Sequence, residues 1–167
     1  KINQYNLFGD ANCFGLFSSV SGTIRNVVID NATIDITLNA SNTSISSIVN
    51  IGVITAINNG VIENCSVNLA NSNINFTTRA QNTTYNMGLI AGLNNQNQTI
   101  SYANTTNGSN YSHLVDCANG GKLTINVEKG NGNFDKNTHF NFGGVVGCNA
   151  GTISANYSDN SSQSVRE

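Results

Sequence analysis

Four copies of one pattern run through the sequence, and this repetition limits the fold more than any other feature. In each copy a short apolar run beside a glycine is followed by a small polar corner and then by a second strand-like run. The four apolar runs begin at Phe14, Ile51, Met87 and Phe142. These starts lie 37, 36 and 55 residues apart, so the third copy carries about 19 additional residues. A period in this range is typical of repeat architectures, in which each repeat buries its apolar face against the next.

The pattern within each repeat favours strands over helices. Residues 34–38 and 123–127 alternate apolar and polar side chains, which is the period of a strand with one buried face. No segment keeps a helical period for two turns, and the abundant Asn, Gly and Thr are poor helix formers. We read three short strands in each repeat. The sequence predicts an all-β parallel β-helix (β-solenoid) of three full coils plus a partial fourth, with about 36–37 residues per coil. A β-sandwich is the alternative, but it needs no faithful repeat.

Matched residues of successive coils are expected to stack about 4.8 Å apart. The second strand of each repeat opens with an apolar residue, and the predicted column is Ile24, Ile62, Leu114 and Ile153. Two residues later comes a small or polar residue, which we interpret as a corner because Asn and Asp tolerate the left-handed conformation. The predicted corners are Asn26, Asn64, Asp116 and Ala155.

These repeats predict one β-solenoid domain over residues 1–158, followed by a polar tail over 159–167. The repeats cover about 14–50, 51–86, 87–141 and 142–158, and an exposed insertion is expected over about 94–112. The chain starts at Lys1 without a signal-peptide pattern, so we expect it to be a piece of a longer protein.

Composition excludes several classes of partner. The net charge is -2 and only 10% of residues are charged, so there is no basic footprint for nucleic acid or an anionic membrane. No run of 18 apolar residues exists, which predicts no membrane span in this segment. The 32 Asn and 32 Ser or Thr residues suit either a disordered tract or a solenoid with tight polar corners. The regular recurrence of apolar residues favours the solenoid.

The sequence offers no catalytic or metal-binding constellation. Four cysteines occur without a CxxC pair, and His113 and His139 are isolated. Solenoid polysaccharide lyases and hydrolases need clustered carboxylates, whereas Asp30, Asp35 and Asp116 are scattered. We therefore predict no catalytic residue, no metal and no cofactor, and we expect the protein not to be an enzyme.

The four cysteines allow alternatives. Cys65 and Cys117 each follow a predicted corner and would stack in one column, where they form either a disulfide or a ladder of free buried thiols. Cys13 and Cys148 lie near opposite ends of the stack. Each is predicted to be a free thiol or to bridge to the next subunit.

Twelve Asn-x-Ser/Thr sequons suggest either a glycosylated surface protein or an automatic consequence of an Asn- and Thr-rich chain. We expect Asn64 to stay unmodified because its corner points inward. The eleven remaining candidate sites are Asn31, Asn39, Asn42, Asn75, Asn82, Asn97, Asn104, Asn107, Asn110, Asn156 and Asn160.

Residues 143–157, GGVVGCNAGTISANY, resemble a GLUG repeat: a Gly-Gly-apolar-apolar-Gly run, an Asn-Gly-like corner, then Thr-Ile and an Asn-Cys-Tyr-like end. Asn64-Cys65 matches the Asn-Cys part and Asp116-Cys117 approximates it, whereas the first three copies lack the second glycine of the opening pair. The resemblance covers about a third of the chain. It implies a β-solenoid spacer of the kind found in large surface proteins, including adhesins and IgA-specific metallopeptidases. No His-Glu-x-x-His occurs, so peptidase activity does not carry over.

We expect a non-enzymatic, extracellular or cell-surface structural or adhesive segment of a larger surface or filament protein. Its expected partners are other copies, through end-to-end self-association of coil ends, and a glycan or host-surface ligand. The alternatives are a carbohydrate-active β-helix enzyme with Asp30, Asp35 or Asp116 as its acids, and a glycan-binding module that uses outward Thr and Asn.

Overall fold

A computed structural model of the chain describes residues 12–29, 33–38, 47–68, 73–78, 83–104, 115–116, 122–127 and 138–157. These residues form eighteen strands and no helix. The strands assemble into five sheets in which all pairing is parallel. The prediction of an all-β parallel β-helix is confirmed. None of the described residues lies in a helix that could cross a membrane.

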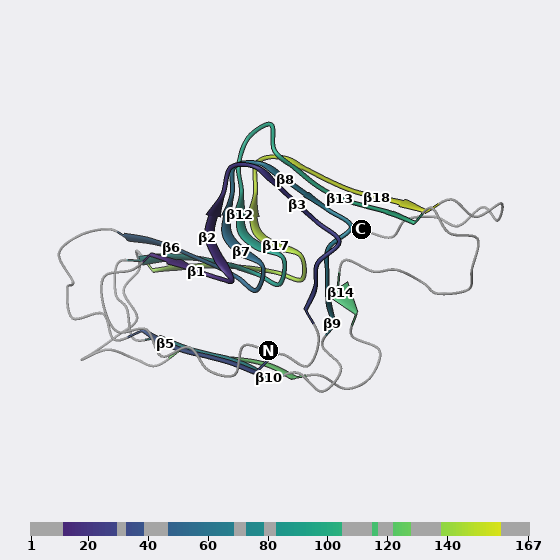
Figure 1. Ribbon diagram of the computed structural model, residues 1–167. Coiled ribbons are helices and arrows are strands. Elements are labelled where there is room, and N and C mark those ends of the chain that lie inside the picture. The colour runs from purple at the N-terminus through teal and green to yellow at the C-terminus, as the bar shows by residue number, and fades with distance from the viewer. Residues whose placement is uncertain are drawn as a thin grey trace.

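The chain visits the five sheets in a fixed order, and each circuit is one coil. In Figure 1 the view runs nearly along the stack, so equivalent strands such as β2, β7, β12 and β17 nest behind one another. Sheet A contains β1 (Cys13–Phe14), β6 (Ser47–Gly52), β11 (Thr83–Gly88) and β16 (His139–Gly143). Sheet B contains β2 (Phe17–Val20), β7 (Thr55–Asn58), β12 (Ala91–Asn94) and β17 (Val146–Asn149).

Three further sheets complete each circuit. Sheet C contains β3 (Thr23–Arg25), β8 (Val61–Glu63), β13 (Thr99–Asn104) and β18 (Thr152–Tyr157). Sheet D contains β4 (Val28–Ile29), β9 (Ser66–Asn68) and β14 (Val115–Asp116). Sheet E contains β5 (Thr33–Leu38), β10 (Asn73–Thr78) and β15 (Lys122–Val127). The described residues therefore make three coils of five strands and a fourth coil of three.

The residues at which the four repeats were expected to begin pair with one another between coils. Phe14 pairs with Ile51, Ile51 pairs with Met87, and Met87 pairs with Phe142. The expectation of three strands per repeat was wrong, since the described residues of each full coil form five. The apolar run that begins at Ile51 is divided between two strands, because the chain turns at Val53 and Ile54 and returns as β7. Both turn residues are buried, at 7% and 0% exposure, so this turn belongs to the core.

Glycines allow sheets A and B to pack against each other, and this explains the glycines of the repeated motif. A Cβ atom at Gly92 would lie 2.4 Å from the backbone nitrogen of Ile51. A Cβ atom at Gly147 would lie 2.2 Å from the backbone nitrogen of Met87. Real Cβ atoms do not approach other heavy atoms so closely, so each position requires a residue without a side chain.

The predicted insertion and the predicted third-coil corner both need correction. The offset between paired residues of the second and third coils is 36 from Thr55 to Ala91, 38 from Val61 to Thr99 and 48 from Val67 to Val115. The larger increase falls after β13. Residues 94–104, expected to belong to the exposed insertion, therefore continue the coil.

A missing asparagine explains where the third coil departs from the pattern. Asn26 and Asn64 adopt the left-handed conformation, with φ of 58° and 51°, as predicted for corners. The next residue in the same register is Tyr102, which pairs with Ala155. Neither Tyr nor Ala favours this conformation, so β13 and β18 run straight through the position. The corners expected at Asp116 and Ala155 were wrong.

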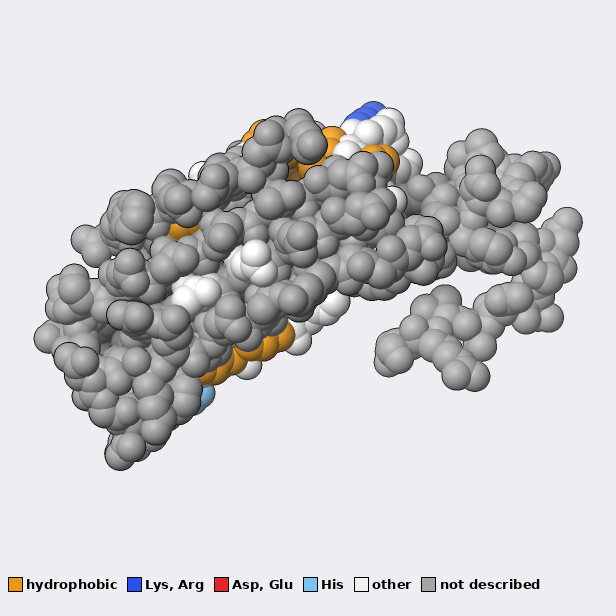
Figure 2. Space-filling view, turned by 90° about the horizontal axis from the view of Figure 1, so that it is seen from below, with side chains coloured by type: hydrophobic (Ala, Val, Ile, Leu, Met, Phe, Trp, Pro, Cys, Tyr) orange, Lys and Arg blue, Asp and Glu red, His pale blue; other side chains and the backbone are white. Residues whose placement is uncertain are grey.

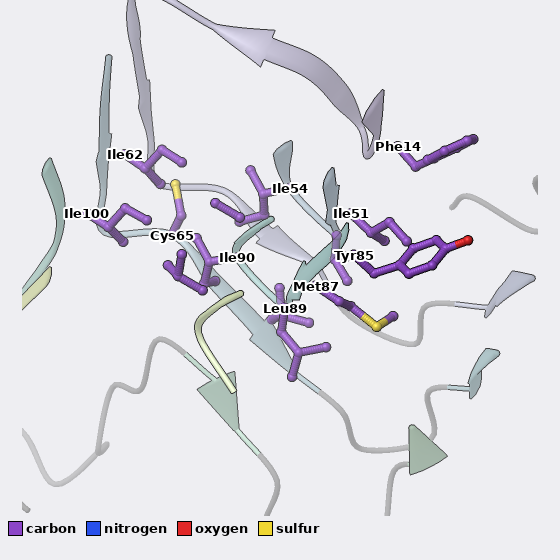
Figure 3. Packing of buried hydrophobic residues seen from close by; sticks show 14 of the residues in the cluster. Phe14, Ile51, Ile54, Ile62, Cys65, Tyr85, Met87, Leu89, Ile90 and Ile100 are labelled. Atoms are coloured by element: carbon purple, nitrogen blue, oxygen red, sulfur yellow. The ribbon is translucent and has the colours of Figure 1, made fainter. Parts of the chain in front are cut away.

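The buried column of sheet C contains Ile100 where Leu114 was expected. Ile62 pairs with both Ile24 and Ile100, and Ile100 pairs with Ile153. Ile62 and Ile100 are 0% exposed. Figure 3 shows these two side chains next to Cys65, with Ile54 and Ile90 nearby. The core therefore consists of short columns of matched residues that run along the stack.

Candidate functional site

A ladder of three asparagines joins the coils within sheet A. The Asn141 amide nitrogen donates to the amide oxygen of Asn86 at 2.8 Å, and the Asn86 amide nitrogen donates to the oxygen of Asn50 at 2.9 Å. Asn50 and Asn86 are each 5% exposed. Buried amides are costly unless they are hydrogen-bonded. The three amides satisfy one another, so any coil shifted by one residue would lose these bonds.

A second ladder lies where sheet B leads into sheet C. The Asn58 amide nitrogen donates to the oxygen of Asn94, and the Asn94 nitrogen donates to the oxygen of Asn149, both at 2.8 Å. Asn58 and Asn94 are 0% exposed. The oxygens of Asn58 and Asn149 also accept from the backbone nitrogens of Gly60 and Gly151. These side chains therefore fix both the corner and the stacking of coils. On the surface, the Asn95 side chain donates to Asn59.

In the first coil, the positions that would continue the two ladders are not occupied by asparagine. Cys13 lies opposite Asn50, and Val20 lies opposite Asn58. Asn141 and Asn149 at the other end of each ladder are exposed. The two ends of the stack thus differ chemically.

Aromatic residues extend the core to the fourth coil. Tyr85 is 0% exposed, and its ring stacks on Phe140 with centroids 5.2 Å apart and planes 8° from parallel. The Phe140 ring contacts Phe142, with centroids 5.7 Å apart. Phe142 is 44% exposed, whereas Met87 in the same column is 5% exposed. The fourth coil therefore presents aromatic surface at the end of the stack.

The cysteines of the described residues are free thiols. Cys65 is 0% exposed, and its sulfur lies 3.4 Å from the backbone oxygen of Glu63. Burial raises the pKa of Cys65, against a smaller lowering effect of a backbone hydrogen bond from Val27. Burial also raises the pKa of Cys13, whose hydrogen bond with Asn50 acts in the opposite direction.

The alignment behind the predicted Cys65–Cys117 column was wrong. It matched Asn64 with Asp116, whereas Asp116 pairs with Asn68. Cys117 itself lies outside the described residues. Cys148 is half-buried in the fourth coil.

Charged groups form few contacts in the described part of the chain. The Arg25 Nε lies 2.9 Å from Glu63 Oε1, and both side chains are partly exposed, so this bridge between coils contributes little stability. No three His, Cys, Asp or Glu residues among those described could hold a metal ion. Asp35 lies in sheet E and Asp116 in sheet D, and His139 is exposed. Asp30 and His113 fall outside the described residues.

The predicted sequons fall in different environments. Asn97 is exposed in the turn between β12 and β13, with φ of 64°. Asn75 and Asn64 are half-buried, and the backbone nitrogen of Asn64 donates to the oxygen of Ser101. Asn104 and Asn156 lie within β13 and β18. The sites outside the described residues are Asn31, Asn39, Asn42, Asn82, Asn107, Asn110 and Asn160.

Sequence reasoning missed the asparagine ladders, although a signal for them exists. Each ladder has steps of 36 and 55 residues, the same spacing as the starts of the last three repeats. In a chain with 32 asparagines, this coincidence is visible only after the repeats have been aligned residue by residue.

The described arrangement holds coils together and fixes their register. The buried amides bind one another, and the buried apolar side chains pack in columns. Comparisons with protein-family models, curated proteins and solved structures found no match.

Proposed function

We propose that this chain is a non-enzymatic structural or adhesive β-solenoid segment of a larger surface or filament protein, located outside the cell. The observation that supports this most is the use of the buried polar residues. In the middle coils the buried asparagines bind their counterparts in neighbouring coils. Residues used in this way build an elongated, register-locked support.

The resemblance to GLUG repeats supports the same proposal. Of the glycines that carry it, Gly143 and Gly147 lie where sheets A and B pack closely. The motif would then specify how coils pack, which fits the role of such repeats as spacers in surface proteins. Membership of that family remains a proposal.

Immunogold labelling tests location and role together. Antibodies raised against the chain are applied to intact cells of the native source, with an antibody to an internal protein as control. We expect label on the outer surface or on surface filaments of unpermeabilised cells. Label that appears only after permeabilisation would contradict the proposal.

Incubation with pectin, alginate and host glycans tests the absence of catalysis. We expect no release of oligosaccharide. Turnover that disappears in Asp35→Asn or Asp116→Asn variants would instead establish the carbohydrate-active alternative. Retention on a glycan array without turnover would indicate an adhesive glycan-binding role.

Glycosylation should depend on how each sequon is presented. We expect Asn97 to carry glycan when the chain is secreted by a glycosylating host, because its side chain is exposed in a turn. Asn64 should stay unmodified, because it is half-buried at a corner whose backbone is bonded to Ser101. Site-resolved mass spectrometry measures both occupancies. Full occupancy at Asn64 with none at Asn97 would contradict this expectation.

A further inference from the structure

The fourth coil exposes apolar residues whose counterparts in the middle coils are buried. Ile153 is 38% exposed, whereas Ile100 in the same column is 0% exposed. Phe142 is 44% exposed, whereas Met87 is 5% exposed. Figure 2 shows hydrophobic side chains along one edge of the molecule, beside a histidine side chain drawn in pale blue. These residues are exposed because the described stack has no coil beyond the fourth.

The first coil shows the same effect at the opposite end. Phe17 is 43% exposed, but it belongs to the column of Thr55 and Ala91, both of which are 0% exposed. Ile24 is partly buried against the core. Phe14 is already 2% exposed and would add little new contact area. The open apolar surface at this end thus lies on sheets B and C.

The two ends match when a first coil is placed on a fourth coil in the register that the chain uses internally. Phe17 of a second copy, which is 43% exposed, then lies on Val146, which is 9% exposed. Its Ile24 covers Ile153, which is 38% exposed. Its Gly15 falls on Gly143, in the column where Gly52 and Gly88 also lie. Glycine is needed in this column, since a Cβ atom at Gly88 would lie 2.5 Å from the Cα of Val146.

We infer that the fourth coil of one copy binds the first coil of a second copy, parallel and in register, so that copies join head to tail. This inference rests on the proposed structural function and specifies its partner. The contact is heterologous, and an interface of this kind that does not close into a ring continues to add subunits. The same head-to-tail contact also pairs the edge strands at the two ends of the stack.

A symmetric contact between two fourth coils fits less well. Such a pair would run its strands antiparallel or turn the inward faces outward, and the columns would no longer continue. The head-to-tail register also separates the cysteines. Cys13 would lie on Asn141 in sheet A, whereas Cys148 would meet Ser19 in sheet B. The contact is therefore non-covalent, and the intersubunit bridge considered for Cys13 and Cys148 does not form.

Two variants, one at each end, test the inference. Phe17→Lys places a charge on the first coil, and Phe142→Lys places one on the fourth. Ile48→Lys is the matched control, because Ile48 is 55% exposed on the outward side of a middle coil. Sedimentation velocity measures mass for each protein and for an equimolar mixture of the two end variants. Far-UV circular dichroism checks folding, and Ile153→Lys provides a second fourth-coil variant.

We expect the average mass of the unaltered chain and of Ile48→Lys to rise with concentration above the 17.6 kDa of one copy. Each end variant alone should remain a monomer. Their mixture should form dimers and nothing larger, because one intact first coil can meet one intact fourth coil. Monomers of the unaltered chain at concentrations up to about 1 mM would overturn the inference.

Other results would overturn it as well. Dimers of Phe17→Lys alone would show a symmetric contact between fourth coils, and a mixture that stays monomeric would exclude the head-to-tail contact. Surface labelling of a chain that remains monomeric would leave the proposed function standing, so the two ideas can fail separately.

Discussion

The middle coils and the outer coils carry similar residues at matched positions, but the middle coils bury them far more completely. Ile100 in the third coil and Ile153 in the fourth are the same residue, paired in the same column, with exposures of 0% and 38%. The difference lies in the neighbouring coil and not in the residue. Each coil thus receives much of its stability from contact with the next, as in other repeat proteins.

The largest expected effect comes from removing one isoleucine of this pair. Ile100→Ala should lower the free energy of unfolding by about 4 kcal/mol, because it leaves a cavity between two coils. Ile153→Ala should cost about 1 kcal/mol, because that side chain keeps much of its contact with water. Urea unfolding of both variants measures the difference. Equal losses would show that the fourth coil is as well covered as the third.

A glycine pair sharpens the comparison through backbone packing. Gly92→Ala should cost about 3 kcal/mol, since the new Cβ atom would lie 2.4 Å from the backbone nitrogen of Ile51, which cannot move as a side chain can. Gly144→Ala in the fourth coil is the control. A Cβ atom there meets nothing within 4 Å, so we expect little change. Thermal unfolding checks both, and a stable Gly92→Ala variant would refute the close approach of sheets A and B.

The sequence was sufficient to predict the fold class and two of the corners. These depend on local signals, namely the two-residue alternation, the glycine runs and the asparagines at 26 and 64. The third coil was misread because Leu114 resembles Ile62 by local pattern, whereas Ile100 holds the position. Tyr102 replaces the corner asparagine, so no local signal marked where the chain departs.

The residues that hold the coils together were hidden for a different reason. The sequence does not distinguish an asparagine in a buried ladder from an asparagine on a loop. The difference lies only in the residue that each asparagine contacts in the next coil. The packing of sheet A on sheet B is likewise a contact between segments distant in sequence. The site could therefore be predicted only after the exact register was known.

Variants of the asparagine ladders should show the same contrast between middle and outer coils, with smaller losses in the free energy of unfolding. Asn86→Ala removes the acceptor of Asn141 and the donor to Asn50, and it leaves the buried Asn50 oxygen without this bond. We expect a loss of about 2 kcal/mol. Asn141→Ala should cost less than about 1 kcal/mol, because water reaches the exposed end of the ladder. Urea unfolding decides, and a neutral Asn86→Ala would show that the ladder does not stabilise the stack.

The smallest effect concerns Cys65, a buried thiol of the second coil. Burial raises its pKa above the ordinary value of 9.0 in the folded chain. Above about pH 9 the unfolded chain has therefore released this proton while the folded chain still holds it. The folded state then binds more protons than the unfolded state, so the free energy of unfolding falls as pH rises. Below that pH the thiol is protonated in both states, and its contribution is constant.

Melting temperatures at pH 8 and pH 10 test this through the difference between the unaltered chain and Cys65→Ala. Lysines and tyrosines titrate in the same range in both proteins, so the difference isolates the thiol. We expect the unaltered chain to lose more stability between the two pH values than the variant does. Cys148→Ala in the fourth coil is the control, because that residue is half-buried at the end of the stack. Equal responses of the Cys65 and Cys148 variants to pH would show that the Cys65 thiol is not buried in the core. The contrast between middle and outer coils would then not extend to Cys65, which lies where sheet C leads into sheet D.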